Sequence, residues 1–105
     1  MEKELAYHWR VMRSERPDLF EPSYEWRQNL NNNPIIPQKY KQLMMVAMAC
    51  TIRYSLGIQT HARMAIEAGA TKEELYAAVA QTMTIGGIPA YRTGMETLKD
   101  YFGEY

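Results

Sequence analysis

Residues 41–69, KQLMMVAMACTIRYSLGIQTHARMAIEAG, combine two amphipathic helical patterns with one histidine, His61. The first pattern has a wide apolar face, as expected of a central helix. Its members are Leu43, Met44, Val46, Ala47, Cys50 and Thr51. The second has an apolar stripe of Ile58, Ala62, Ala65 and Ile66. It runs to Gly69, which suits a left-handed helix cap. Between them, Ser55 suits a helix start and Gly57 weakens helix continuity. We therefore expect a helical hairpin that breaks or bends around residues 54–57.

Two shorter helical patterns precede this hairpin. The apolar stripe of the first consists of Leu5, Trp9 and Met12. Their spacings of four and three predict a helix that ends before Pro17. Pro22 suits the first turn of a second helix, which we expect to end at residues 31–34, NNNP. Its candidate buried side chains are Tyr24, Trp26 and Leu30. Pro37 then opens the third helix, which holds the first pattern of the hairpin.

Two more helices are expected after the hairpin. Thr71 and Glu74 form a capping-box pattern, which predicts a helix start because the hydroxyl and the carboxylate satisfy exposed amides. The buried face of this helix should contain Leu75, Ala78, Val79 and Met83. Gly86-Gly87 ends it, and Pro89 opens a last helix that carries Met95, Leu98 and Phe102. About six helices and no strand signal predict an all-α fold, with residues 1–105 in a single domain.

Composition narrows the function classes. Twelve basic and twelve acidic side chains leave no formal net charge, which argues against a nucleic-acid partner. The longest apolar run, residues 43–50, is far below the ~20 residues that span a bilayer, and we expect neither a membrane helix nor a signal peptide. A single cysteine does not suggest an oxidising compartment, so we expect a cytoplasmic protein. A domain of this size buries a limited share of its surface, so help from partner subunits is plausible.

His61 is the main candidate for chemistry. It lies beside Ala62 on the second pattern, so its ring should border the apolar stripe. Two interpretations stay open: a core histidine that donates to a backbone carbonyl, or a general acid and base. We expect no metal, since His8 is the other histidine and no ligand set surrounds His61. Cys50 lies in an apolar run, where a thiol behaves as a small hydrophobe with a raised pKa.

Four segments together resemble the carboxymuconolactone decarboxylase family, whose superfamily includes the alkylhydroperoxidase D-like proteins. They are residues 37–43 (PQKYKQL), 61–65 (HARMA), 69–75 (GATKEEL) and 86–90 (GGIPA). The resemblance covers roughly Pro34 to Leu98. It implies an alkylhydroperoxidase D-like helical fold around a helical hairpin, with no cofactor, assembled as a homotrimer or homohexamer through methionine-rich and aromatic faces.

The peroxidase branch of this family carries Cys-x-x-Cys-x-x-x-His and a glutamate one helix earlier. Aligned on His61, the two cysteine positions fall on Tyr54 and Gly57, and the glutamate position on Gln42. A dithiol cycle needs an attacking and a resolving thiol. Cys50 lies one helical turn before the first expected thiol and has no such partner. Peroxiredoxin-type activity, although typical of the family, is therefore disfavoured.

The resemblance instead favours the branch of cofactor-free decarboxylases, in which His61 would be the catalytic residue and a small acid the substrate. Gln42 and Tyr54 would orient the ring or substrate oxygens, and Arg92 would hold a substrate carboxylate. The alternative is an oligomeric binding protein that has kept this fold without catalysis.

Overall fold

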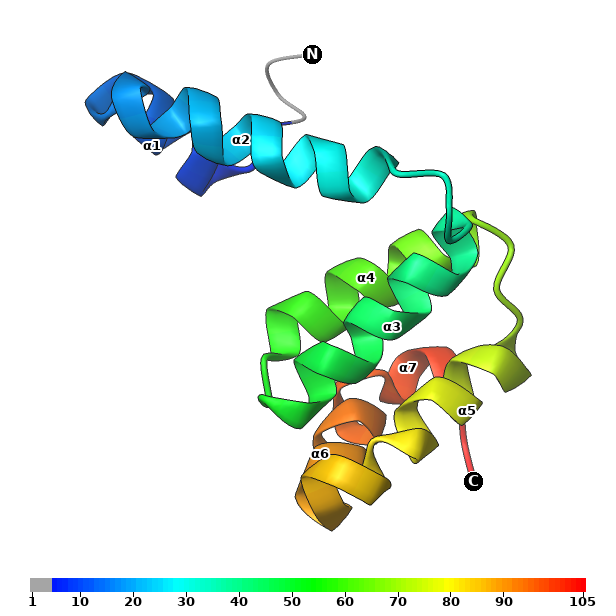
Figure 1. Ribbon diagram of the computed structural model, residues 1–105. Helices are drawn as coiled ribbons and strands as arrows, with labels where there is room; N and C mark the ends of the chain where they lie inside the picture. Colours follow the sequence, from blue (N-terminus) through cyan, green and yellow to red (C-terminus); the bar gives the residue numbers. More distant parts are fainter. Residues whose placement is uncertain (1–4) are drawn as a thin grey trace. The chain divides into compact units, whose positions relative to one another are not determined.

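The computed structural model describes residues 5–105, which form helices and no strand (Figure 1). The helices are α1 (Tyr7–Glu15), α2 (Pro17–Asn32), α3 (Gln38–Thr51), α4 (Ser55–Glu67), α5 (Lys72–Gln81), α6 (Met83–Thr97) and α7 (Lys99–Phe102). The all-α prediction is confirmed. The chain divides into two compact units, residues 1–34 and 35–105. The single domain expected over residues 1–105 stays a prediction, because compactness alone does not show that either unit folds independently.

In the first unit, α1 and α2 are joined by aromatic contacts. The Trp9 ring packs edge-on against Phe20 and Tyr24, with ring centroids 6.0 and 5.4 Å away. The Phe20 and Tyr24 rings stack at 5.1 Å. Such pairs add to the free energy gained by burying their area. The predicted helix over Trp9 and Met12 is confirmed, although Leu5 lies before its first turn.

The predicted start of the second helix is wrong, and of its predicted buried side chains only Tyr24 packs against α1. α2 begins at Pro17, where the missing N–H needs no helical partner, and Pro22 lies inside the helix. An internal proline removes one backbone hydrogen bond, and α2 continues through it. Trp26 is 67% exposed and Leu30 is also exposed, because Phe20 and Tyr24 supply the side chains that meet α1.

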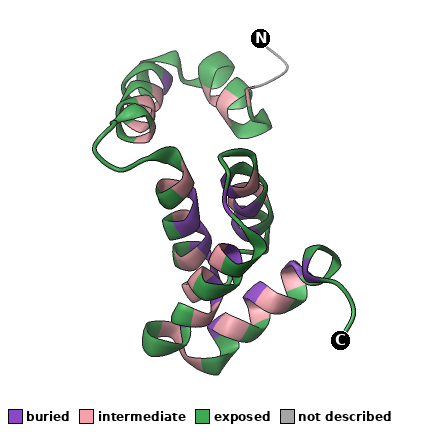
Figure 2. Ribbon diagram, turned by 90° about the vertical axis from the view of Figure 1, so that its right-hand side faces the viewer, coloured by how far each residue is buried: buried purple, intermediate pink, exposed green. Residues whose placement is uncertain are grey.

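In the second unit, α3 and α4 form the predicted hairpin, and their packing is the most extensive between any two described helices. In Figure 2 the buried positions of this unit lie on helix sides that face one another. The fully buried members of the core are Val46, Cys50, Ile58, Ala65, Leu75, Val79 and Ala90. Met44, expected on the buried face of α3, is exposed, while Ala49 and Gln42 are buried. The hairpin therefore buries a narrower stripe of α3 than expected.

The turn of the hairpin differs from its prediction in detail. Ser55 is the first residue of α4, and Tyr54 precedes it without a side-chain cap. Arg53 takes a left-handed conformation, with φ 57°, and the Tyr54 amide donates to the Ala49 carbonyl at 2.8 Å. Gly57 lies inside α4, where a Cβ atom would stand 2.6 Å from the Tyr54 ring. Its role is thus close packing, not the interruption of a helix.

The predicted boundaries around α5 are only partly confirmed. Gly69 has φ 102°, as a left-handed cap requires, and Thr71 forms the capping box with Glu74. However, α5 ends at Gln81, and Met83 is exposed at the start of α6. The expected break at the glycine pair is present as a kink within α6 at Gly87, whose φ of 75° and ψ of −177° form a conformation that favours glycine. α7 is a separate short helix.

Replacement of Thr71 by alanine tests the capping box. The Thr71 hydroxyl accepts from the Glu74 amide at 3.0 Å, and the Glu74 carboxylate accepts from the Thr71 amide at 2.9 Å. Thr71→Ala should lower the free energy of unfolding by about 1 kcal/mol, measured in urea. Thr71→Ser keeps the hydroxyl and should stay close to the wild type. Equal stability of the alanine variant and the wild type would contradict this role.

Candidate functional site

The structure brings His61 on α4 to Gln42 on α3. His61 Nδ1 lies 2.7 Å from Gln42 Oε1. The Gln42 side chain is buried, with 3% of the residue exposed, and the imidazole of His61 is half-buried. The Gln42 amide nitrogen in turn donates to Gln38 Oε1 at 3.3 Å. The histidine therefore has a side-chain partner, where the structural interpretation of the sequence expected a backbone carbonyl.

The orientation of the Gln42 amide determines the tautomer of His61. Since the amide nitrogen is directed to Gln38, the amide oxygen faces the imidazole. An amide oxygen only accepts hydrogen bonds, so Nδ1 of His61 carries the proton of this bond. In the neutral ring, Nε2 is then the basic nitrogen. The arrangement assigns proton uptake and release to Nε2 and leaves Nδ1 as the anchor.

Packing of the hairpin explains why these two side chains meet. Gln42 lies one helical turn before Val46, on the buried side of α3, and His61 is adjacent to buried Ala62 on α4. Near the turn, Gly57 allows α4 to approach α3, since a Cβ there would be 3.3 Å from the Ala49 methyl group. The apolar stripes fix the register of the two helices, and that register sets Gln42 opposite His61.

The structure does not join the other two predicted site residues to this pair. Tyr54 is 52% exposed and lies two helical turns before His61, about 10 Å along the axis of α4. Arg92 is exposed on α6. Among the described residues, neither Tyr54 nor Arg92 has a hydrogen bond to His61 or Gln42. Their roles toward a substrate stay predictions.

Gln38 was not recognised from the sequence. It lies at the first position of α3 and contacts Gln42 four residues later, the spacing at which helical side chains meet. That four-residue spacing was the feature of the sequence that could have indicated the contact. It was not used because the sequence did not show that Gln42 is buried, and the contact matters only because it orients a buried amide.

Cys50 is a core residue. Its side chain is fully buried, and burial raises the pKa of the thiol to about 11. A Cβ on Gly94 would lie 2.7 Å from Cys50 Sγ, which shows how closely α6 covers the sulfur. The prediction of a small hydrophobe with a raised pKa is confirmed. Such a thiol is a poor nucleophile, because the thiolate is the reactive species.

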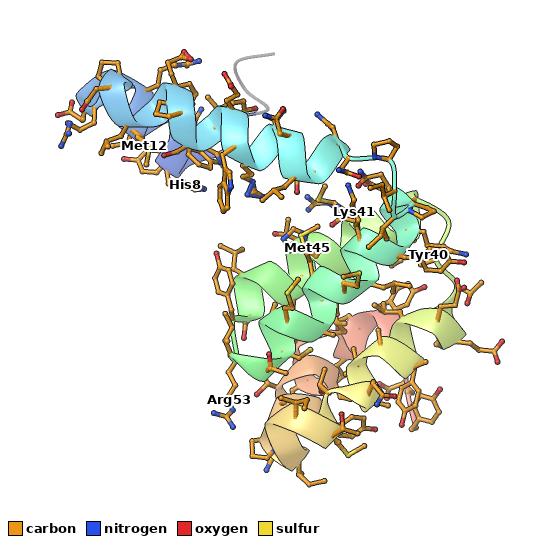
Figure 3. The ribbon with its side chains drawn as sticks, in the orientation of Figure 1. His8, Met12, Tyr40, Lys41, Met45 and Arg53 are labelled. Carbon is orange, nitrogen blue, oxygen red and sulfur yellow. The ribbon has the colours of Figure 1, made fainter. Side chains whose placement is uncertain are left out.

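Several other charged or titratable side chains lie on the surface. Arg63 pairs with Glu67 at 3.9 Å on the exposed side of α4. Arg53 extends outward at the hairpin turn (Figure 3). His8 is exposed on α1, with its ring 4.8 Å from that of Trp9. Within residues 5–105, no group of three potential metal ligands comes together, and no helix is long and apolar enough to cross a membrane.

Comparison with known proteins identifies the family of this chain. Residues 17–100 match the carboxymuconolactone decarboxylase family. The chain belongs to this family. No curated protein matches it. In this member of the carboxymuconolactone decarboxylase family, a histidine on the second helix of the hairpin pairs with a buried amide, and the thiol lies in the core.

Thiol labelling tests the inert state of Cys50. Near neutral pH, iodoacetamide should alkylate Cys50 slowly in the folded protein and rapidly after unfolding in urea, because burial suppresses both access and ionisation. Mass spectrometry measures both rates. Equal rates in the two states would show that the thiol is reachable and contradict the core assignment.

The raised pKa of Cys50 also makes the stability of the protein depend on pH in the alkaline range. The unfolded thiol ionises near its ordinary pKa of 9.0, whereas the folded thiol keeps its proton until about pH 11. The unfolded state therefore binds fewer protons in this window, and the stability of the wild type should fall relative to that of Cys50→Ala as the pH rises through it.

Proposed function

We propose that this protein catalyses the cofactor-free decarboxylation of a small carboxylated lactone or a related acid, with His61 as general acid and base. The observation that carries the proposal is the 2.7 Å contact between His61 Nδ1 and the oxygen of buried Gln42. It holds a half-buried imidazole in one tautomer, with Nε2 as the nitrogen that exchanges protons. Membership of the carboxymuconolactone decarboxylase family supports the reaction class.

The proposed reaction needs one proton and no electron acceptor. As the bond between the carboxylate and the adjacent carbon breaks, carbon dioxide leaves and the electron pair stays on that carbon as a carbanion or enolate. His61 in its imidazolium form donates the Nε2 proton to this carbon, and water restores the proton to the ring. Proton transfer by a positioned side chain contributes about 10²–10⁴-fold to such a rate.

Gln42 suits this cycle because it is neutral. Nδ1–H can donate to the amide oxygen in both the neutral ring and the imidazolium, so the ring keeps its orientation as Nε2 gains and loses its proton. A carboxylate at the same position would favour the charged ring. The amide thus anchors the ring without holding it in one charge state.

Tyr54 and Arg92 have proposed roles in binding the substrate, Tyr54 toward the lactone oxygens and Arg92 toward the carboxylate. Support for Arg92 is that α6 packs against both α3 and α4, and that a guanidinium forms paired hydrogen bonds with a carboxylate. Unchanged affinity for a bound acid in Arg92→Ala would remove that role.

One observation favours a second candidate, a non-catalytic oligomeric binding protein of the same fold. Neither of the two grooves described on the second unit includes His61. Alkylhydroperoxidase activity is the weakest alternative. Buried Cys50, with its raised pKa, has no second cysteine in the chain.

Turnover of 4-carboxymuconolactone tests the catalytic proposal, followed by loss of ultraviolet absorbance and release of carbon dioxide. His61→Gln should lower kcat by about 10²–10⁴-fold, the contribution expected of a general acid. His8→Gln is the matched control, because it removes the other histidine, and should retain the wild-type rate. Turnover that survives in His61→Gln would contradict the role of His61. Absence of turnover in the wild type would favour the binding protein.

We also propose that the protein forms a homo-oligomer, a trimer or a hexamer. Along α3 and at its C-cap, Met44, Met48 and Ile52 recur every four residues and are all exposed. Leu56, Ile85 and Ile88 are further exposed apolar side chains of the second unit. Apolar stripes of this kind are typical of protein interfaces. A second copy of this chain is the occupant that the family resemblance implies.

Light scattering after gel filtration tests the assembly. The wild type should have the mass of three or six chains. Met44→Lys/Met48→Lys should lower that mass, because burying two unpaired charges is costly. Ala77→Lys, which places a charge on an exposed position of α5, is the control and should leave the mass unchanged. A monomeric wild type would contradict the proposal.

A further inference from the structure

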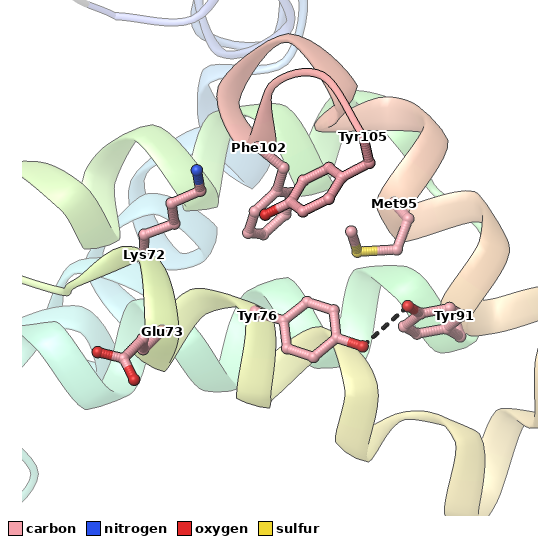
Figure 4. Close-up of a pocket in the computed structure, with 7 residues that line it drawn as sticks. All are labelled: Lys72, Glu73, Tyr76, Tyr91, Met95, Phe102 and Tyr105. Atoms are coloured by element: carbon pink, nitrogen blue, oxygen red, sulfur yellow. Dashed lines mark hydrogen bonds between the residues drawn. The ribbon is translucent and has the colours of Figure 1, made fainter.

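A groove that could bind a ligand lies away from His61. This groove of about 630 Å³ runs between α5, the end of α6 and the C-terminal residues. Figure 4 shows its lining side chains, which are Lys72, Glu73, Tyr76, Tyr91, Met95, Phe102 and Tyr105. Its volume is in the range that holds small organic ligands. Neither His61 nor Gln42 lines it.

Aromatic side chains that contact one another form the wall of this groove. The Tyr76 ring meets Tyr91 and Phe102 edge-on, with centroids 6.1 and 6.0 Å away. Phe102 is buried, so the packing of α7 holds one side of this arrangement in place. Ring faces that are left open beside edge-on neighbours suit stacking with a flat ligand.

The groove has two polar features that would favour a ligand with oxygen acceptors, and the first is a pair of tyrosine hydroxyls. The Tyr76 and Tyr91 hydroxyls lie 2.9 Å apart, so one donates to the other. The accepting hydroxyl keeps its own hydrogen for an acceptor on a ligand. The hydrogen bond with Tyr76 raises the pKa of Tyr91, and a tyrosine hydroxyl is protonated at neutral pH even at its ordinary pKa of about 10.

The second polar group is the ammonium of Lys72. In Figure 4 its side chain extends toward the side of Phe102 and Tyr105, whereas the Glu73 carboxylate turns away from the rings. Lys72 has no ion-pair partner among residues 5–105. A ligand whose flat body contacts the rings would thus meet a positive charge and a hydroxyl donor.

We propose that this groove binds a small aromatic or planar unsaturated carboxylate. The rings take the flat body of the ligand, while Lys72 and the Tyr76–Tyr91 hydroxyl pair take its oxygens. The proposal does not depend on catalysis at His61, since the groove contains none of the residues placed in that site.

Binding of 1-naphthoate to the full-length protein tests the proposal. The ε-methyl group of Met95, labelled with carbon-13 and assigned with Met95→Leu, reports binding from inside the groove. Its NMR signal should shift saturably with 1-naphthoate, while the signals of Met44 and Met48 on α3 stay in place. His61→Gln should leave this titration unchanged, which separates it from the decarboxylation proposal.

Matched ligands and variants test the polar contacts. Lys72→Met keeps most of the length of the side chain and should weaken 1-naphthoate binding by up to about fivefold, the range of an exposed ion pair. Tyr91→Phe should weaken it by about two- to tenfold. Lys99→Met removes a lysine that does not line the groove and should have no effect. Neutral 1-naphthylmethanol should bind more weakly than naphthoate and should not respond to Lys72→Met.

Three results would overturn the proposal. Equal or tighter binding of 1-naphthylmethylammonium would show that the groove selects cations. Equal binding of 1-naphthoate to Lys72→Met, Tyr91→Phe and the wild type would show an apolar surface without selectivity. A Met95 signal that does not shift with 1-naphthoate would show that the groove takes no such ligand, including the case in which a second copy of the chain covers it.

Discussion

Close packing of α3 against α4 is the constraint on which the second unit depends. The contact uses small residues, Ala49 and Gly57 near the turn and Ala62 further along, so the two helices approach closely. The same register places Gln42 opposite His61 at 2.7 Å. A shift of one residue along either helix would turn these side chains away from each other. The core and the candidate site therefore rest on the same contact between helices.

The chemistry of the site follows from what this packing buries and what it leaves accessible. Gln42 is buried and hydrogen-bonded at both ends of its amide, whereas the His61 ring is half-exposed. Cys50 is instead sealed between α3 and α6, where ionisation is disfavoured. A half-exposed ring with an anchored Nδ1 is compatible with proton transfer by His61. A thiol cycle at Cys50 is incompatible with the burial of this cysteine and with the absence of a second cysteine.

Local signals in the sequence were reliable where a few adjacent residues determine the structure. The capping box at Thr71 and the left-handed cap at Gly69 depend on their immediate neighbours, and both are present. Trp26 and the start of α2 were wrong because tertiary packing decides them: Phe20 and Tyr24 meet α1, and α2 continues through its internal proline.

The candidate site was only partly predictable for the same reason. Gln42 came from the family resemblance, since its partner lies nineteen residues away on the next helix. Gln38 was missed because its role depends on the burial of Gln42. Tyr54 and Arg92 were placed by alignment with a family pattern and by proximity to a turn, and neither argument locates a side chain in space.

The tautomer of His61 is the central claim of this account, and NMR measures it directly. In protein labelled with nitrogen-15 at histidine, His8→Gln leaves His61 as the one histidine signal. The account predicts that at a pH where the ring is neutral, Nδ1 has the shift of a protonated nitrogen and Nε2 that of an unprotonated one. The opposite assignment would mean that Gln42 does not accept from Nδ1, and the proposed proton-transfer role of Nε2 would fail with it.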